Sequence, residues 1–563
     1  MTGKRFISGL LQRPVLLFSL LGAIFFLPWL GEVHLFDWDE INFAEAAREM
    51  ILLEDYLRVH INFQPFWEKP PLFFWLQVLA MKGLGIGEYA ARLPNAICGI
   101  LTLGLLVRIG QKLYDSRFGI FWALSYFGSV LPHLYFKSGI IDPWFNLFIF
   151  AGLYLFVQGY WKRDELSELD LPLRSGTYFA LGGLVLGLAV LTKGPVAGLI
   201  IGLVLLVYWI KKRFRLFVGI PQVLLFAVAA LFPFGLWLGI ESWKNGSWFI
   251  TEFTTYQIRL LQTKDAGHGG FLGYHVIVLL IGCFPASIFA LKSLLGKIET
   301  GYKKDFRFWM LALFWVVLIL FSLVQSKIIH YSSLCYFPLT YLSALTLYRL
   351  SHEHIQWNGI LRWGLYGIGG LYALLCISAP ILANSLDFLE PLYANDPSAV
   401  ASIRAEVPWS GWEFIPGVCL LALMFGADRL FLAGSFNKGS WTLFGGSALF
   451  VILALIFYVN KVESYSQRAA IEHWEQLQGK DCYVAPFSYK SYAPYFYGQV
   501  PPSEPDSKAH DINWLLFGEI DKDVYITTKI HRLDRLVGHV PDIEEIGRKN
   551  GFVFLIRKKK LDK

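Results

Sequence analysis

An acidic cluster follows the first long apolar run of the chain, in the stretch Phe36–Met50 (FDWDEINFAEAAREM). Five of its fifteen residues are acidic, although only 17% of the whole chain is charged. Asp37, Asp39 and Glu40 stand together where a helix is expected to begin. A lone aspartate there would fit a helix N-cap, but three neighbouring carboxylates favour a chemical role. Asp39 is therefore our candidate for a general base, which would remove a proton from an attacking hydroxyl group.

Two lysines and one further aspartate lie at the ends of later apolar runs. Lys193 sits in the four-residue connection Thr192–Pro195, which leaves its side chain little room to reach away. Lys327 has a similar setting just before another apolar run. Asp142 directly precedes a proline, so it fits a helix N-cap as well as it fits a site residue. We expect all three at the same face of the membrane as Asp39.

Two other loops add charged residues to this face. Glu68 and Lys69 lie in the same loop as Asp39, and Arg259 and His268 lie in a later one. On its own, Arg259 fits a solvated loop and His268 fits a glycine-rich turn. Their interest comes from the combination of several cations with carboxylates at one membrane boundary.

This combination predicts a specific chemistry. Several cations near a membrane surface suit a phosphate carried on a lipid, because contacts between opposite charges are strong in a partly dry site. A carboxylate beside them suits a base that activates an acceptor hydroxyl group. Sugar transfer from a polyprenyl phosphate needs both, and one displacement would invert the anomeric carbon. We find neither a Rossmann glycine fingerprint nor a Walker loop, and such a donor needs no nucleotide site.

The composition indicates a polytopic membrane protein. The chain has 563 residues, of which 55% are hydrophobic, and many apolar runs are long enough to cross a bilayer core of about 30 Å. The net charge of +7 does not indicate a nucleic-acid partner, because the basic residues cluster in short loops between spans. No CxxC pair occurs among the six cysteines, so they suggest neither a zinc site nor a disulfide framework.

Thirteen of these runs are interpreted as membrane spans, and the first loop between them covers residues 31–92. Inside it, the short run Leu72–Leu84 is expected to be a helix in the membrane interface. With the N-terminus inside, the inner loops hold 22 Lys and Arg residues in 86 positions, and the outer loops hold 12 in 139. This asymmetry agrees with the positive-inside rule. It predicts that the candidate site residues and the tail lie outside.

The tail is predicted to be a separate domain. We divide the chain into a membrane domain, residues 1–460, and a small α/β domain, residues 461–563. Hydrophobic periodicity predicts an amphipathic helix and three strands in the tail. The helix is Ser464–Leu477, and the strands are Cys482–Phe487, Val524–Thr528 and Phe552–Ile556.

Several short motifs, in this order, resemble those of the GT-C membrane glycosyltransferases. The resemblance is to the protein O-mannosyltransferases and, more closely, to the aminoarabinose transferases that modify lipid A. It covers roughly residues 30–345. The motifs are DExxFAExxREM from Asp39, FWEKPP from Phe66, ARLP from Ala91, LTKGP from Leu191, HGGF from His268 and SKIIHY from Ser326.

The resemblance implies roles for these residues. Asp39 would be the catalytic aspartate and Asp142 a second acid of the active face, with Glu40 and Glu45 in support. The donor phosphate path would be lined by Lys69, Lys193, Arg259 and Lys327. Tyr331 belongs to the last motif and is counted with the site. A divalent cation between Glu68 and His268 is an option that the resemblance leaves open, but no cofactor or metal is required.

One position departs from the aminoarabinose transferases. They often have an arginine three residues after the catalytic aspartate, and this chain has Asn42 there. One phosphate contact is therefore missing, or is supplied by Arg48 or Arg58.

The resulting prediction is an all-α polytopic GT-C enzyme of about thirteen spans with a small α/β tail, in a bacterial inner membrane. It would be an inverting glycosyltransferase that takes a monosaccharide from undecaprenyl phosphate, with its active site and tail in the periplasm. The acceptor would be lipid A or another glycan. The alternative within the class is a protein O-glycosyltransferase. The alternative from another class is a transporter or lipid flippase, whose charges are usually at the midplane of the membrane and which often has repeat symmetry.

Overall fold

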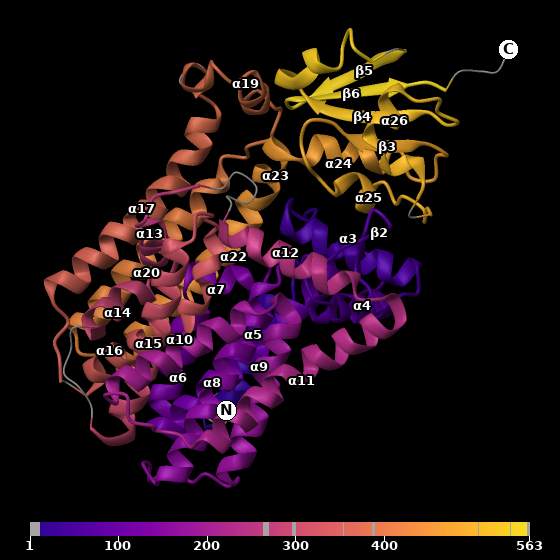
Figure 1. Cartoon of the computed structure of the whole chain (residues 1–563). Helices are drawn as coiled ribbons and strands as arrows, with labels where there is room; N and C mark the ends of the chain where they lie inside the picture. The colour runs from indigo at the N-terminus through magenta and orange to yellow at the C-terminus, as the bar shows by residue number, and fades with distance from the viewer. Residues whose placement is uncertain are drawn as a thin grey trace.

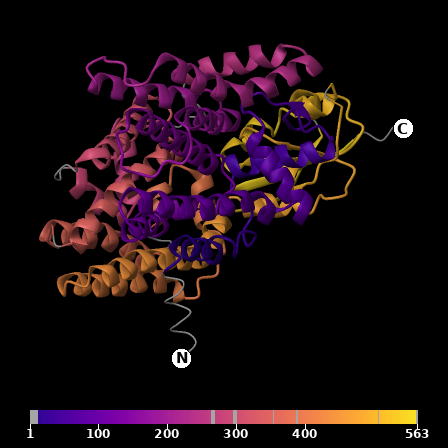
Figure 2. The same cartoon turned by 90° about the horizontal axis from the view of Figure 1, so that it is seen from below.

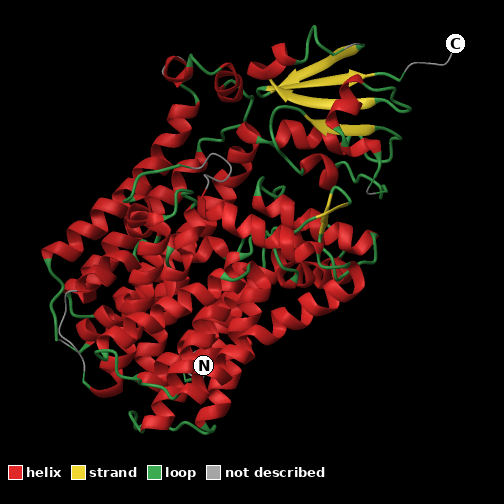
Figure 3. Cartoon of the chain, viewed as in Figure 1, coloured by secondary structure: helices red, strands yellow, loops and turns green. Residues whose placement is uncertain are grey.

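The helices of the chain pack side by side into one bundle (Figure 1). The computed structural model describes residues 12–262, 269–294, 300–352, 354–385, 389–504, 506–540 and 542–559. The C-terminal residues form a small sheet with helices against it at one end of the bundle (Figure 3). The predicted mostly helical fold is therefore confirmed.

Among the described residues, seven helices are long and apolar enough to cross a membrane. They are α5 (Glu88–Leu113), α9 (Ser175–Lys193), α11 (Ile220–Asn245), α15 (Gly301–Leu323), α17 (Gly359–Ala383), the helix Trp412–Leu432 that contains α20 (Ile415–Leu432), and Phe436–Ser466. An eighth would be the pair α13 (Tyr274–Gly282) and α14 (Ala286–Leu294), bent by 117°. Helices that do not meet these criteria occupy the other predicted spans: α2 (Pro14–Phe26), α6 (Ser116–Phe127), α8 (Asp142–Asp164), α10 (Val196–Lys211) and α16 (Tyr336–Ser351). The count of thirteen spans stays a prediction.

Glycines let neighbouring helices approach closely. A Cβ atom at Gly110 of α5 would lie 2.5 Å from the Cα atom of Gly119 on α6. One at Gly183 of α9 would lie 2.3 Å from the carbonyl oxygen of Phe226 on α11. A side chain at either glycine would push the helices apart. Because lipid is as apolar as a helix surface, such close backbone packing is a main source of helix association in membranes.

The first loop folds into a compact unit that contacts the tail. It contains α3 (Asp39–Leu52), the hairpin of β1 (His60–Ile61) and β2 (Gln64–Pro65), and α4 (Leu72–Leu84). Apolar side chains of α3 and α4 share one core with Ile471, Trp474 and Tyr497 of the tail. The loop and the tail consequently lie together at the same end of the molecule (Figure 2).

The tail contains a four-stranded sheet in the order β3-β4-β6-β5, in which β3 is parallel to β4 and the other pairs are antiparallel. Three strands match the predicted ones: β3 (Tyr483–Pro486), β4 (Val524–Lys529) and β6 (Phe552–Arg557). The strand β5 (Ile543–Lys549) was not predicted. It is an edge strand rich in charged residues, so it lacks the apolar alternation that marks a half-buried strand.

The predicted helix Ser464–Leu477 is wrong in one respect. It consists of two helices, α23 (Asn460–Ser466) and α24 (Arg468–Glu475), which meet at Gln467. The hydrophobic pattern runs through this break because residues on both sides keep the helical period. The break places the Gln467 side chain against the first loop, a contact that no local pattern encodes.

Candidate active site

A cavity of about 320 Å³ opens where the first loop meets the ends of several bundle helices. Its volume lies in the usual range for small-ligand sites. The polar residues that line it come from five separate stretches of the chain: Asp37, Asp39, Glu40, Asn42, Glu68, Lys69, Lys193, Tyr256, His330 and Tyr331. The structure thus brings together many of the residues that the sequence nominated, with cations and carboxylates facing one space.

Asp39 is the first residue of α3 and lines this cavity. The residue before the helix is Trp38, so Asp39 does not occupy the N-cap position itself. Its side chain is 31% exposed, and Oδ2 lies 3.5 Å from Nε2 of His330. A carboxylate that is accessible from the cavity and close to an imidazole can accept a proton from a bound hydroxyl group.

Asp142 lies deeper than Asp39, at the start of α8. Its Oδ1 accepts a hydrogen bond from Nζ of Lys193 at 2.6 Å, and its Oδ2 lies 3.8 Å from Nε2 of His330. The imidazole therefore lies between the two aspartates. Burial is the largest influence on His330 and lowers its pKa, although Asp142 and Asp39 act in the opposite direction.

Lys69 and Lys193 are the cations that line the cavity. Nζ of Lys193 lies 5.4 Å from the centre of the Tyr331 ring, and Nζ of Lys69 lies 5.2 Å from that of Tyr256. The Tyr256 hydroxyl donates a hydrogen bond to Glu68 at 3.0 Å. Arg259 lies one turn along α12 (Trp248–Gln262), and its Cζ atom is 5.3 Å from the centre of the same Tyr256 ring. Arg259 does not itself line the cavity. Tyr256 thus links three of the predicted site residues.

Glu40 lies at the cavity wall, but its carboxylate is already occupied. Arg92 of α5 donates two hydrogen bonds to it, at 3.0 and 2.8 Å, and the backbone N–H groups of Phe36 and Gly139 donate to it as well. Burial alone would raise the pKa of Glu40, but the charge and hydrogen bonds of Arg92 lower it overall. This geometry fits a carboxylate that fixes the loops carrying Asp39 and Asp142.

Besides Asp142 and Arg259, four further predicted residues do not line the cavity. Arg48 and Glu45 form a buried ion pair with two hydrogen bonds, at 2.7 and 2.8 Å, and Arg48 also donates to the carbonyl oxygen of Val500 in the tail. Arg58 pairs with Glu241 at 3.0 Å. Lys327 donates to the carbonyl oxygens at the end of α15, among them Ser322 at 2.7 Å. Each of these side chains therefore has a structural partner.

Sequence reasoning did not assign roles to His330, Tyr256 or Arg92. His330 lies in the motif SKIIHY and Arg92 lies in the motif ARLP. Their place in these motifs was the signal that could have identified them. Tyr256 belongs to the amphipathic helix α12, where its residue type and spacing carried no signal.

The option of a divalent cation finds no support. Within the described part of the chain, no group of three or more His, Cys, Asp or Glu side chains could hold a metal ion. Glu68 is hydrogen-bonded to Tyr256. His268 lies outside the described residues.

Comparisons with known proteins find relatives for part of the sequence and for the fold. Residues 68–237 match the family described as dolichyl-phosphate-mannose-protein mannosyltransferase. The chain is 27% identical to an undecaprenyl phosphate-alpha-4-amino-4-deoxy-L-arabinose arabinosyl transferase of Edwardsiella ictaluri (strain 93-146), over 61% of each chain. It is 25% identical to the enzyme with the same name from Aeromonas salmonicida (strain A449), over 70% of each chain.

Solved structures extend the similarity to nearly the whole chain. The crystal structure of ArnT from Cupriavidus metallidurans bound to undecaprenyl phosphate has a TM-score of 0.74 at 18% identity, and covers 96% of this chain and 98% of that one. The apo structure of the same protein has a TM-score of 0.72 at 17% identity, and covers 97% of this chain and 98% of that one. The chain therefore shares the polytopic membrane fold of these ArnT structures. In sequence, the chain is similar to the protein mannosyltransferase family over residues 68–237 and to the arabinosyl transferases over a larger part of its length.

Proposed function

We propose that this protein transfers a monosaccharide from a polyprenyl phosphate, of the undecaprenyl type, to a hydroxyl-bearing acceptor. The matched region spans 61% of the length of the Edwardsiella relative, so donor and acceptor are proposals for this chain. The observation that carries the proposal is the cavity in which Asp39 faces Lys69 and Lys193. A base and two cations around one space are what such a transfer requires.

In the proposed reaction, the Asp39 carboxylate takes the proton of the acceptor hydroxyl group. The acceptor oxygen then bonds to the anomeric carbon of the sugar. At the same time, the bond between that carbon and the phosphate oxygen breaks, and the bonding electrons leave with the polyprenyl phosphate. Lys69 and Lys193 stabilise the charge that develops on this phosphate. A single displacement of this kind inverts the anomeric carbon.

The second aspartate has a supporting part in this proposal. Asp142 holds Lys193 by the 2.6 Å hydrogen bond and faces His330, which in turn faces Asp39. We expect this chain of contacts to orient Asp39 and Lys193 toward the reacting atoms. Glu40, which is bonded to Arg92, is expected to position the loops rather than to exchange a proton.

The test is transfer by the purified protein. Labelled undecaprenyl-phosphate aminoarabinose and mannose are each offered with three acceptors: lipid A, a free glycan and a hydroxyl-bearing peptide. We expect inverted product with lipid A or the glycan. Product only with the peptide would instead identify a protein O-glycosyltransferase. Movement of the donor across a vesicle membrane without any transfer would overturn the proposal in favour of a flippase.

Replacing the base tests the mechanism. Asp39→Asn keeps the size of the side chain but removes its basic oxygen, so we expect transfer to fall by about 10²–10⁴-fold. Size-exclusion and thermal-unfolding profiles of the variant should match those of the wild type. Full activity in Asp39→Asn would remove Asp39 as the base.

A further inference from the structure

The backbone just before Asp39 has no regular secondary structure and lies between two other parts of the chain. On the side of the bundle, Arg92 donates hydrogen bonds to the carbonyl oxygens of Leu30, Val33 and His34, each at 2.8 or 2.9 Å. The same guanidinium group binds Glu40. Arg92 therefore fixes the path of the loop from the side of the helical bundle.

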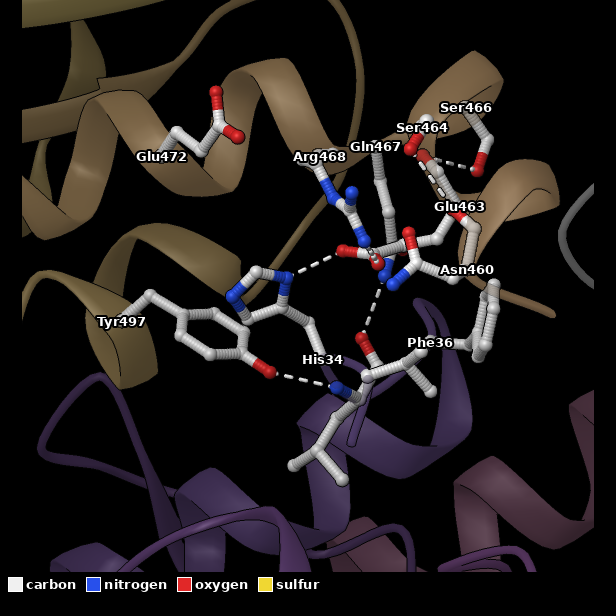
Figure 4. A network of polar contacts seen from close by, with 12 residues as sticks. His34, Phe36, Asn460, Glu463, Ser464, Ser466, Gln467, Arg468, Glu472 and Tyr497 are labelled. Atoms are coloured by element: carbon white, nitrogen blue, oxygen red, sulfur yellow. Dashed lines mark hydrogen bonds and ion pairs between the residues drawn. The ribbon is translucent and has the colours of Figure 1, made fainter. Parts of the chain in front are cut away.

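The tail holds the same segment from the opposite side. The Tyr497 hydroxyl accepts a hydrogen bond from the backbone N–H of Leu35 at 2.6 Å. The amide of Gln467 donates to the Leu35 carbonyl oxygen at 2.7 Å and accepts from the N–H of Asp37 at 3.1 Å. Figure 4 shows Gln467, at the turn between α23 and α24, and Tyr497, from α25 (Ala493–Tyr497), both reaching this segment.

An ion pair adds to this contact. The His34 imidazole is hydrogen-bonded to Glu463, which is buried and also bonded to Arg468 of the tail (Figure 4). Glu463 belongs to α23 and Arg468 is the first residue of α24, so the two side chains come from either side of the interruption. Gln467, the residue at which the helix is interrupted, is thus also the residue that forms hydrogen bonds with the loop.

The tail makes two kinds of contact with the first loop: apolar packing, which joins the two parts, and hydrogen bonds to the backbone before Asp39, which fix its path. Apolar packing of Ile471, Trp474 and Tyr497 against the first loop already joins the tail to the bundle. Gln467 instead satisfies backbone polar groups of Leu35 and Asp37, which lie four and two positions before Asp39. Backbone groups that have no partner in a helix or sheet take their conformation from whatever side chain binds them.

We propose that the C-terminal tail is a working part of the active site, in which Gln467 and Tyr497 are positioning residues for Asp39. They hold residues 35–37 so that α3 begins where the Asp39 carboxylate faces the cavity. This inference rests on the proposed function for its effect on catalysis. The contact itself does not depend on which sugar or acceptor is used.

The experiment compares Gln467→Met and Tyr497→Phe with the wild type in the full-length protein. Each variant keeps the shape of its side chain but loses hydrogen bonds worth about 1 kcal/mol each. We expect kcat to fall about five- to thirty-fold, with the donor KM changed less than about twofold. Tyr483→Phe is the matched control, because the Tyr483 hydroxyl binds Asp521 within the tail and does not contact the first loop.

Hydrogen exchange of the backbone supplies a second readout that needs no substrate. The amides of Leu35 and Asp37 should exchange faster in Gln467→Met and Tyr497→Phe, while those of the sheet stay protected. Unchanged exchange at these amides, or a kcat within twofold of the wild type in both variants, would overturn the inference. If the wild type transferred no sugar at all, the proposed function would fail, and the exchange result would still decide whether the tail fixes this segment.

Discussion

At the scale of residues, the site is organised around an imidazole between two carboxylates. His330 lies 3.5 Å from Asp39 and 3.8 Å from Asp142, and Lys193 binds Asp142 on its other side. Two acids in such different surroundings can take different parts. Asp39 is open to the cavity and suits proton transfer, whereas Asp142 is buried with a cation and suits orientation.

The proposed phosphate path can be tested at Lys69. Replacing it with methionine keeps an apolar stem but removes the charge. A hydrogen bond to a charged group is worth about 1.5–3 kcal/mol, so we expect kcat/KM for the donor to fall about tenfold or more. Steady-state kinetics with varied donor concentration would measure this.

Lys82 is the control for this experiment, because it also lies in the first loop but faces the Tyr56 ring outside the cavity. Lys82→Met should leave donor kinetics unchanged. Equal donor kinetics in Lys69→Met and Lys82→Met would refute the phosphate role.

At the scale of elements, the start of α3 is held between α5 and the tail. Arg92 binds it from the bundle, and Gln467, Tyr497 and Glu463 bind it from the tail. This explains how a loop without regular structure can present Asp39 in one orientation. The contact between the loop and the tail should also depend on pH, because the titratable side chain of His34 binds Glu463 there.

Burial alone would lower the pKa of His34, but the hydrogen bond and charge of Glu463 raise it overall, and Glu475 and Glu88 add to the rise. A histidine with a raised pKa in the folded state stabilises that state fully below its unfolded pKa of about 6.5. The contribution is lost as the pH rises through the raised folded value. The His34–Glu463 contact should therefore weaken on the alkaline side.

Thermal unfolding of the wild type and His34→Gln between pH 5.5 and pH 9 checks this direction. Glutamine keeps a polar side chain that does not titrate. We expect the difference in Tm between the two proteins to be largest at pH 5.5 and to shrink toward pH 9. A difference that stayed constant over the whole range would mean that His34 does not carry the charge.

At the scale of the whole molecule, the cavity, the first loop and the tail lie at one end of the bundle. The surplus of Lys and Arg in the loops at the other end predicts that the cavity faces the periplasm. Sugar donors carried on a lipid would then reach the cavity from within the membrane, and acceptors from the outer side.

Labelling with a thiol reagent that cannot cross membranes tests this orientation. In a background without the six native cysteines, a cysteine at the exposed Lys508 of the tail should react in intact spheroplasts. A cysteine at Arg215, exposed in the loop after α10, should react only after lysis. The reverse pattern would place the cavity on the cytoplasmic side.

The sequence by itself determined the features that depend on local pattern. Apolar runs predicted where the helices lie, alternation predicted β3, β4 and β6, and α4 has the bounds of the run Leu72–Leu84. The residue types in short loops nominated Asp39, Lys69 and Lys193, because charged side chains are costly there without a purpose. The motifs then indicated the superfamily.

Only the tertiary structure decided which of these residues meet. The contacts of Glu40 with Arg92, of Arg58 with Glu241 and of Gln467 with Leu35 join positions 52, 183 and 432 residues apart. Such pairings depend on how helices and tail pack, and no local periodicity records them. For this reason Glu40 looked like a site acid from its neighbours in sequence. In space, its carboxylate binds Arg92 and the backbone N–H groups of Phe36 and Gly139, so we expect it to hold the loop that carries Asp39.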